Sequence, residues 1–573
     1  MTSSPIAGIR PAGARALLVE LASLADVTAL HTQLKAQPLP GQVDVLAAAA
    51  TVLVRFAGRR ETVAAAAQIS ALDLRHADAP EARTVTIDTV YDGADLAEVA
   101  RLTGLSEDAV VKAHTGSNWF GGFGGFAPGF TYLTGGDPVL NVPRRNSPRT
   151  AVPAGSVALA GEYSAVYPRE SPGGWQLIGR TNAIMWDLAR PDPALIRPGD
   201  RVIFKPVREL MTTAPASTAA AEATAASVAE APQPAEGGRS WLEVTNPGLQ
   251  SLIQDLGRPG YADLGVAAAG AADTRSARQV NRLTGNPAGA AVIENLFGGL
   301  ELTAHGDTVV ALAGAELPAA VAAPDGTRNR PAPLNAPFVL LDGEMLTLGS
   351  PFRGVRSYLA VRGGFAVEPV LGSRSTDSMS GIGPAPLAAG TRLPVGDVSG
   401  TAPVGAPEPG TLSDGTLAGD DLADGLADGD AATLLRITAG PRQDWFGPEA
   451  AAALTGHTWR TTNESNRIGV RLATDPADPE AHPLRRIRDG ELPSEGVVAG
   501  SLQVPPSGLP VLFLADHPVT GGYPVIAAVV PADLPVAAQL PPGHPVRFVF
   551  VNPDTLAPLS PAAAAGLFPE GTP

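Results

Sequence analysis

Residues 125–133 read Gly-Phe-Ala-Pro-Gly-Phe-Thr-Tyr-Leu, and residues 143–149 follow as Pro-Arg-Arg-Asn-Ser-Pro-Arg. This density of glycine and proline excludes a helix and indicates rigid turns. The two runs bring three aromatic rings and three guanidinium groups close together in the chain. Aromatic rings beside arginines suit a small anionic or amide-like ligand. We therefore expect a ligand site in a turn-rich part of the fold.

The whole chain has the same character. Its 573 residues are enough for about four domains. With 64 glycines and 56 prolines, many short strands joined by turns are expected. The predicted fold class is β-rich (α+β): a small α/β N-terminal domain followed by β-barrel domains.

Composition also limits the chemistry. The chain has no cysteine, which excludes disulfides, thiolate nucleophiles and cysteine-ligated metals. The net charge of −16 argues against nucleic acid as a partner. There is no signal-like N-terminus and no apolar run of membrane-spanning length, so we expect a cytoplasmic protein without a membrane partner. The eight histidines never pair at metal-ligand spacing, so no metal site is predicted.

Lysine is rare, occurring only at Lys35, Lys112 and Lys205. No phosphate-binding Gly-x-x-x-x-Gly-Lys-Ser/Thr motif is present, so any ATP chemistry is not of the P-loop kind. No lysine lies in a Met-Lys-Met context, so the chain has no biotin attachment site.

Local patterns predict strands over 16–20 and 50–56, and a helix over 25–37 with apolar residues at helical spacing. Two short helices are expected over 95–102 and 107–114, and strands and turns follow to residue 206. The second helix has Ser106 as a suitable N-cap.

In the second half, Asp273 is a good N-cap for a helix with an apolar stripe that ends at Gly285. Capping is therefore a sufficient role for Asp273. Residues 198–204 and 542–548 share a Pro-Gly turn that leads into an apolar strand. This similarity predicts that both halves of the chain close with the same kind of strand.

Composition shifts place the domain boundaries. The predicted organisation is an α/β domain (1–90), a barrel (91–210), a flexible Ala/Thr/Ser/Pro linker (211–240), the first half of a second module (241–400), an acidic Gly/Ala/Asp insertion (401–433), the second half (434–560) and a tail (561–573).

Polar residues recur inside glycine-rich turns, where backbone N–H groups can approach a ligand. Such turns also simply connect strands, but several of them carry Arg, Asp or Ser. The first module offers Arg144, Arg145, Arg149, Ser156, Tyr167 and Arg180, and the second offers Gln254, Asp255, Arg258, Gly372 to Asp377, Gln503, Asp516 and Thr520 to Tyr523.

These motifs carry a family resemblance. The segment 125–180 resembles the KipI-like family, whose members include the first component of allophanate hydrolase and the B component of 5-oxoprolinase. Residues 241–550 resemble the KipA-like family, the second component of allophanate hydrolase or the C component of 5-oxoprolinase, through Gln254 to Tyr261, Asn281 to Pro287, Gly372 to Asp377, Gln503 to Pro505 and Thr520 to Pro524. The chain departs from the family pattern at the alanine-rich run before Asp273 and in the acidic insertion.

The resemblance implies cyclophilin-like barrels, one in the first module and two related halves in the second. It also implies a fused B–C component that opens 5-oxoproline to glutamate with ATP, to which Mg²⁺ can be bound, and with a separate LamB/YcsF-type A component. A carboxyltransferase that uses a biotin carrier on another chain, as in urea carboxylase, stays open. So does a non-enzymatic regulator of a histidine kinase. Allophanate hydrolysis itself is rejected, because the Ser–Ser–Lys site of that hydrolase is absent.

Within this interpretation, Asp377 and Arg374 are the predicted catalytic residues, with Arg374 holding a carboxylate or phosphate and Asp377 acting as base or orienting Arg374. The predicted substrate contacts are Arg144, Arg145, Arg180, Phe130, Tyr132 and Tyr523. They would place a small-molecule site between the two modules. The sequence leaves the ATP position and the oligomeric state open, a homo-oligomer included.

Overall fold

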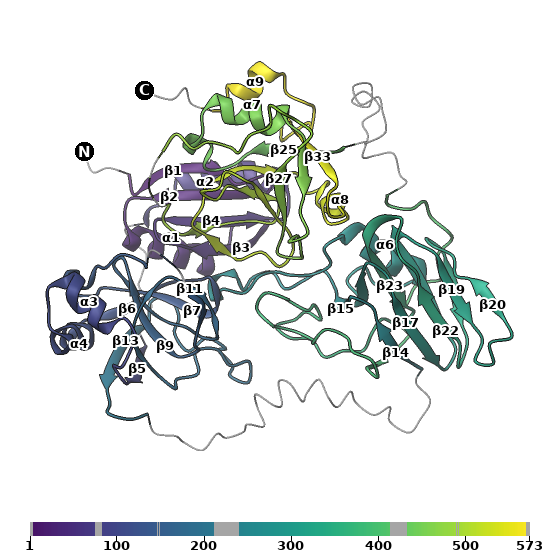
Figure 1. The fold of residues 1–573 in the computed structure, drawn as a ribbon, viewed down its shortest axis with the longest axis horizontal. Helices are drawn as coiled ribbons and strands as arrows, with labels where there is room; N and C mark the ends of the chain where they lie inside the picture. Colours follow the sequence, from purple (N-terminus) through teal and green to yellow (C-terminus); the bar gives the residue numbers. More distant parts are fainter. Residues whose placement is uncertain are drawn as a thin grey trace.

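The computed structural model describes residues 4–74, 83–145, 147, 149–210, 240–412, 432–488, 490 and 492–568. Strands dominate, and the β-rich prediction is confirmed (Figure 1). Nearly all of the expected linker 211–240, the centre of the expected acidic insertion and the last five residues lie outside the described residues. In the described part of the chain, no helix is both long and apolar enough to cross a membrane.

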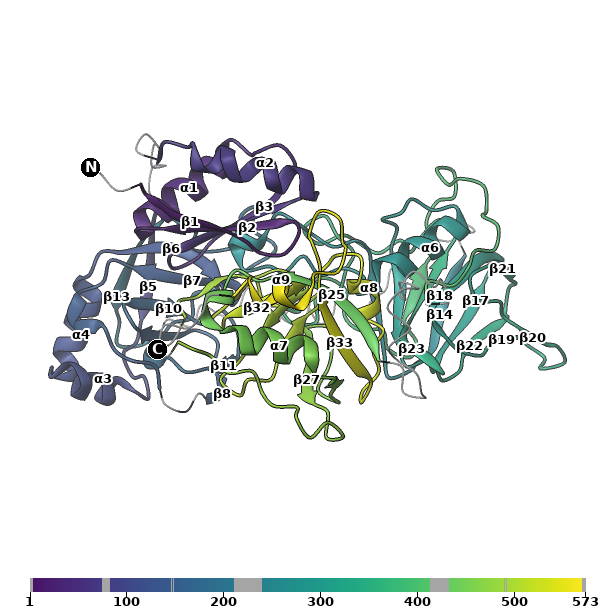
Figure 2. The same cartoon turned by 90° about the horizontal axis from the view of Figure 1, so that it is seen from above.

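The N-terminal domain is a four-stranded antiparallel sheet covered on one face by two helices (Figure 2). Its strands lie in the order β1-β2-β4-β3. The elements are β1 (Ile6–Pro11), β2 (Ala16–Leu21), α1 (Leu24–Ala36), β3 (Gln42–Ala47), β4 (Thr51–Phe56) and α2 (Arg59–Ser70). The predicted strands and helix are confirmed, and β1, β3 and α2 are additional.

The two faces of this sheet have different partners. Val19 and Val52 pack under the helices, whereas Leu18, Leu46 and Leu53 face away from them. The second set packs against Ala262 and Val519, which belong to the second module. The N-terminal domain is therefore attached to distant parts of the chain by apolar burial.

The first barrel contains β5 (Thr84–Thr89), α3 (Leu96–Thr103), α4 (Glu107–Gly116), β6 (Trp119–Gly125), β7 (Ala127–Thr134), η2 (Pro138–Leu140), β9 (Ser156–Ala160), β10 (Tyr163–Val166), β12 (Gln176–Arg180) and β13 (Arg201–Pro206), with β8 (Arg149–Val152) and β11 (Ser171–Gly173) as a separate ribbon. The order is β12-β9-β10-β7-β6-β13-β5, and the bridge between Val90 and Arg180 joins its two edges. Because β5 belongs to this sheet, the barrel begins before the expected boundary at residue 90.

The first half of the second module consists of two antiparallel sheets and one helix. Its elements are β14 (Trp241–Pro247), β15 (Gln250–Gln254), η3 (Ala262–Leu264), α6 (Thr274–Thr284), β16 (Val292–Leu296), β17 (Leu300–His305), β18 (Thr308–Glu316), β19 (Ala319–Ala322), β20 (Asn329–Pro331), β21 (Pro337–Leu340), β22 (Met345–Leu348), β23 (Arg353–Val361) and β24 (Arg392–Pro394). Asp273 caps α6 by accepting from the backbone N–H groups of Arg275 and Ser276, as predicted.

The second half is a closed barrel in the order β25-β32-β29-β30-β27-β26-β33. Its elements are β25 (Thr433–Ala439), η5 (Gln443–Trp445), α7 (Pro448–Gly456), β26 (Trp459–Thr461), β27 (Gly469–Thr474), β28 (Glu495–Gly496), β29 (Ser501–Gln503), β30 (Val511–Phe513), β31 (Thr520–Gly521), β32 (Val525–Val529), α8 (Leu534–Ala537), β33 (Pro545–Phe550) and α9 (Pro561–Ala565).

The two barrels share one construction. In each, the last strand pairs in parallel with the first strand: β13 with β5, and β33 with β25. In each, a tryptophan opens the strand after the helix and donates to a carbonyl five residues earlier: Trp119 to His114 at 2.9 Å, and Trp459 to Leu454 at 3.1 Å. The predicted equivalence of the closing strands is confirmed.

Candidate functional site at the junction of the domains

The loop 372–380 is shaped by a buried carboxylate from another segment. Asp255 accepts from the hydroxyls of Ser373 and Ser375 and from the backbone N–H of Arg374, each at 2.6 Å. Charge-assisted hydrogen bonds of this length fix a loop firmly. The segments 254–261 and 372–377 of the second module therefore form one unit.

Within this loop, the two predicted catalytic residues have different partners. Arg374 donates from Nε to the Val367 carbonyl at 2.5 Å. Asp377 is fully buried and accepts from the backbone N–H groups of Met379 at 2.9 Å and Ser380 at 3.0 Å. Burial, and then the charge of Asp516, raises the pKa of Asp377. Asp377 thus caps a turn next to another carboxylate, and none of the described hydrogen bonds or ion pairs joins it to Arg374.

Asp516 belongs to a buried ion network. Arg467 donates to Asp516 at 2.7 and 2.9 Å and to Glu294 at 2.6 Å. Asp516 also accepts from the backbone N–H of Ser378 at 2.9 Å. Burial alone would raise the pKa of Glu294, but the charges of Arg467 and Arg356 bring it below its usual value. The network joins the loop 372–380, strand β16 and the second barrel.

Arg258 lies between this network and the N-terminal domain. Its side chain is only 2% exposed, it donates to the carbonyls of Val370 and Ser375, and its Nη1 has no hydrogen-bond partner among the described residues. Two residues later, the backbone N–H of Gly260 donates to Asp44 at 3.0 Å. The segment 254–261 therefore connects the loop 372–380 to strand β3.

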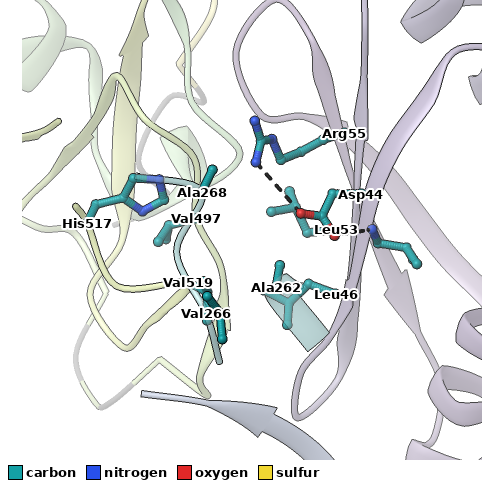
Figure 3. A pocket seen from close by; sticks show the side chains of 11 residues that line it. Asp44, Leu46, Leu53, Arg55, Ala262, Val266, Ala268, Val497, His517 and Val519 are labelled. Carbon is teal, nitrogen blue, oxygen red and sulfur yellow. Dashed lines mark hydrogen bonds and ion pairs between the residues drawn. The ribbon is translucent and has the colours of Figure 1, made fainter. Parts of the chain in front are cut away.

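Asp44 opens onto a small cavity where three parts of the chain meet (Figure 3). The N-terminal sheet contributes Asp44 and Arg55, whose side chains are 3.9 Å apart, and His517 faces them from the second module. The other lining residues are Val45, Leu46, Leu53, Ala262, Val266, Ala268, Val497 and Val519. The volume of about 20 Å³ accommodates roughly one water molecule.

Burial shifts the pKa values of two polar groups that line the cavity. Burial raises the pKa of Asp44. Burial also lowers the pKa of His517 to about 4, so its imidazole is neutral at pH 7. His517 Nδ1 lies 2.7 Å from the Pro518 carbonyl, an acceptor, so Nδ1 carries the proton and Nε2 carries the lone pair. A neutral base and a carboxyl group of raised pKa thus line one cavity.

The arginines predicted in the first module do not meet at this cavity. Arg145 donates to Asp95 at 2.6 Å, and Arg180 is half-exposed and donates to Asp92 at 2.9 Å. Arg144 is exposed. Two of these three guanidinium groups are therefore held by carboxylates of their own module.

The predicted aromatic contacts are also separated. Phe130 lies in the core of the first module, where it makes edge contacts with Tyr132, Tyr167 and Trp175. Tyr132 is buried there too, but its hydroxyl is hydrogen-bonded to Ser494 of the second module. Tyr523 is 44% exposed beneath the Arg486 guanidinium. Their roles as substrate contacts stay predictions.

Sequence reasoning missed Asp44, Arg55 and His517. The signal for Asp44 was a carboxylate inside an otherwise apolar strand, Val-Asp-Val-Leu-Ala. The signal for His517 was its position next to Asp516. Neither signal identifies a partner, because His517 is separated from the other two residues by more than 400 positions.

Comparison with known proteins places the chain in a family. Residues 264–550 match the family profile "Carboxyltransferase domain, subdomain A and B", and residues 7–196 match "Carboxyltransferase domain, subdomain C and D". The chain belongs to the carboxyltransferase domain family. A crystal structure of TTHA0988 is 34% identical, covers 93% of this chain and 99% of that one, and superposes with a TM-score of 0.75.

Two curated relatives match different parts of the chain. It is 34% identical over 312 residues to the C component of 5-oxoprolinase from Escherichia coli K12, covering 54% of this chain and 90% of that protein. It is 50% identical over 133 residues to the B component of 5-oxoprolinase from Escherichia coli O157:H7, covering 23% of this chain and 61% of that protein. Urea amidolyase of Lachancea kluyveri is 30% identical over 54% of this chain and 17% of its own length.

Proposed function

We propose that this chain is the fused B and C component of an ATP-dependent 5-oxoprolinase, which opens the 5-oxoproline lactam to glutamate together with a separate LamB/YcsF-type A component. The observation that carries the proposal is that similarity to the B component and similarity to the C component of 5-oxoprolinase occur in one chain. The structural similarity to TTHA0988 along almost the whole chain supports one continuous architecture.

The cavity at the junction supplies groups that lactam hydrolysis needs. Ring opening requires a base to deprotonate water and an acid to protonate the departing nitrogen. In this proposal, His517 Nε2 takes a proton from the attacking water and returns it to the departing nitrogen. Arg55, held by Asp44, binds an anionic group of the substrate. Because the cavity accommodates about one water, 5-oxoproline enters only if the N-terminal sheet shifts away from the second module.

The test is ATP-dependent release of glutamate from 5-oxoproline, with this chain mixed with the A component and with each protein alone. We expect activity only in the mixture. A mixture of folded proteins that releases no glutamate contradicts the proposal.

A matched pair of histidines tests the site. His517 and His31 are both 7% exposed, and burial lowers the pKa of each to about 4, but only His517 lines the cavity. Loss of a general base typically costs about 100-fold or more in rate. We expect His517→Gln to lower kcat by that factor and His31→Gln to change it less than twofold. Equal effects would remove His517 from the mechanism, and Asp377→Asn and Arg374→Gln test the predicted loop in the same assay.

A carboxyltransferase is the second candidate, favoured by the family's name and by the match to urea amidolyase. It would need a biotin carrier on another chain. Avidin added to the assay separates the two candidates, because avidin blocks a reaction that passes through biotin and leaves direct lactam hydrolysis unchanged.

A further inference from the structure

Outside the junction, a second hollow lies along helix α6. It has a volume of about 520 Å³ and is lined by Arg275, Arg278, Gln279, Arg282, Glu408, Pro409 and Thr411. We call it the basic groove. Its volume is in the range typical of small-molecule sites.

One wall of the groove is the polar face of α6. Residues 275, 278 and 282 are spaced i, i+3 and i+7, so their side chains lie on the same face of the helix. At 1.5 Å per residue, the three arginines extend over about 10 Å of the helix axis. The opposite face of α6 is fixed in the core by Val280 and Leu283, so this row of arginines stands on a rigid element.

The other wall is an extended segment, 402–412, that runs antiparallel to the helix and is fastened to it. Gln279 donates to the Pro409 carbonyl at 2.8 Å, and Ser276 and Thr411 share a hydrogen bond of 2.8 Å. Glu408 accepts from Arg282 at 2.6 Å. The groove is therefore a built feature with two anchored sides.

The charge of the groove favours an anion. Three arginines and one glutamate line it in a chain whose net charge is −16. Glu408 offsets Arg282, so the lining keeps an excess of positive charge.

We propose that the basic groove binds a polyphosphate chain, such as that of a nucleoside triphosphate. Arginine forks bind phosphate oxygens in pairs, and a row about 10 Å long matches several linked phosphates better than one small anion. Naming ATP as the natural ligand rests on the proposed function, whereas polyphosphate binding itself does not.

Calorimetric titration of the full chain, without the A component, tests this proposal. The probes are inorganic tripolyphosphate and ATP, with inorganic phosphate and 5-oxoproline for comparison. We expect tripolyphosphate and ATP to bind at least tenfold more tightly than the two smaller anions. Equal binding of all four, or no binding of tripolyphosphate, overturns the proposal.

Variants locate the site. Arg278→Gln and Arg282→Gln should each weaken tripolyphosphate binding about tenfold, as expected for loss of a charged hydrogen bond. Arg353→Gln is the matched control, because Arg353 and Arg282 both have side chains 56% exposed and both pair with a glutamate. Unchanged binding in both groove variants, or equal loss in the control, refutes the assignment. Turnover is not measured, so this result is independent of the glutamate-release assay.

Discussion

Arg467→Met is the sharpest test of the buried network that joins the two halves of the second module. Arg467 is 3% exposed and donates to both oxygens of Asp516, to Glu294 and to the Gly270 carbonyl. Methionine keeps much of the volume but leaves Asp516 buried without its cation and Glu294 with Arg356 alone. Removing one partner of a buried ion pair costs about 3–5 kcal/mol, so we expect a loss of about 4 kcal/mol in the free energy of unfolding at pH 7.

The effect should depend on pH in a defined direction. In the native protein, the charges of Arg467 and Arg356 hold the pKa of Glu294 below its usual value, which stabilises the fold above about pH 4.5. Without Arg467, less positive charge opposes the burial of Glu294, so its pKa rises and the variant takes up a proton at a higher pH than the native protein does. The difference between variant and native protein should therefore shrink from pH 7 to pH 5.

Urea unfolding followed by tryptophan fluorescence at both pH values measures the effect. Arg330→Met is the control, because Arg330 pairs with Glu344 but its side chain is 41% exposed, and such a pair contributes about 1 kcal/mol or less. A loss below about 1 kcal/mol for Arg467→Met, or a loss that grows on acidification, would refute the reasoning.

Three further outcomes are expected. The free energy of unfolding should fall by about 3 kcal/mol between pH 6.5 and pH 4 through His517 alone. In this range His517 takes up a proton in the unfolded chain but stays neutral in the folded protein, so His517→Gln should flatten this part of the profile. In thermal unfolding, Gly155→Ala should cost more than about 2 kcal/mol and Gly104→Ala about 1 kcal/mol. Both glycines have a positive φ, but of the two only Gly155 has a carbonyl oxygen, that of Thr181, 2.2 Å from an added Cβ. Trp119→Phe and Trp459→Phe should destabilise their own barrels by similar amounts, measured by hydrogen exchange, because each loses the same buried hydrogen bond; markedly unequal losses would argue against the shared construction.

Much of the architecture was predictable from local sequence. The helix at 274–284 was predicted from its N-cap, Asp273, and from its apolar face. Both features depend only on residues a few positions apart. The parallel closing strands were indicated by two similar Pro-Gly turns. Strand β3 was missed, because Asp44 interrupts its apolar pattern.

The predicted site shows where such reasoning ends. The sequence identified the segment around Asp377 as a polar, glycine-rich turn, and Asp377 does cap a turn there. It did not show that Arg374 turns to the Val367 carbonyl, or that Phe130 fills a core, because a guanidinium or a ring takes whichever partner the fold provides.

The sequence by itself therefore determined the β-rich class, the helix ends and the glycine-rich turns, all of which depend on residues a few positions apart. Only the tertiary structure decided which carboxylates are buried, and which histidine faces Asp44 and Arg55. Burial and pairing across several hundred residues set those pKa values, and no local pattern encodes them.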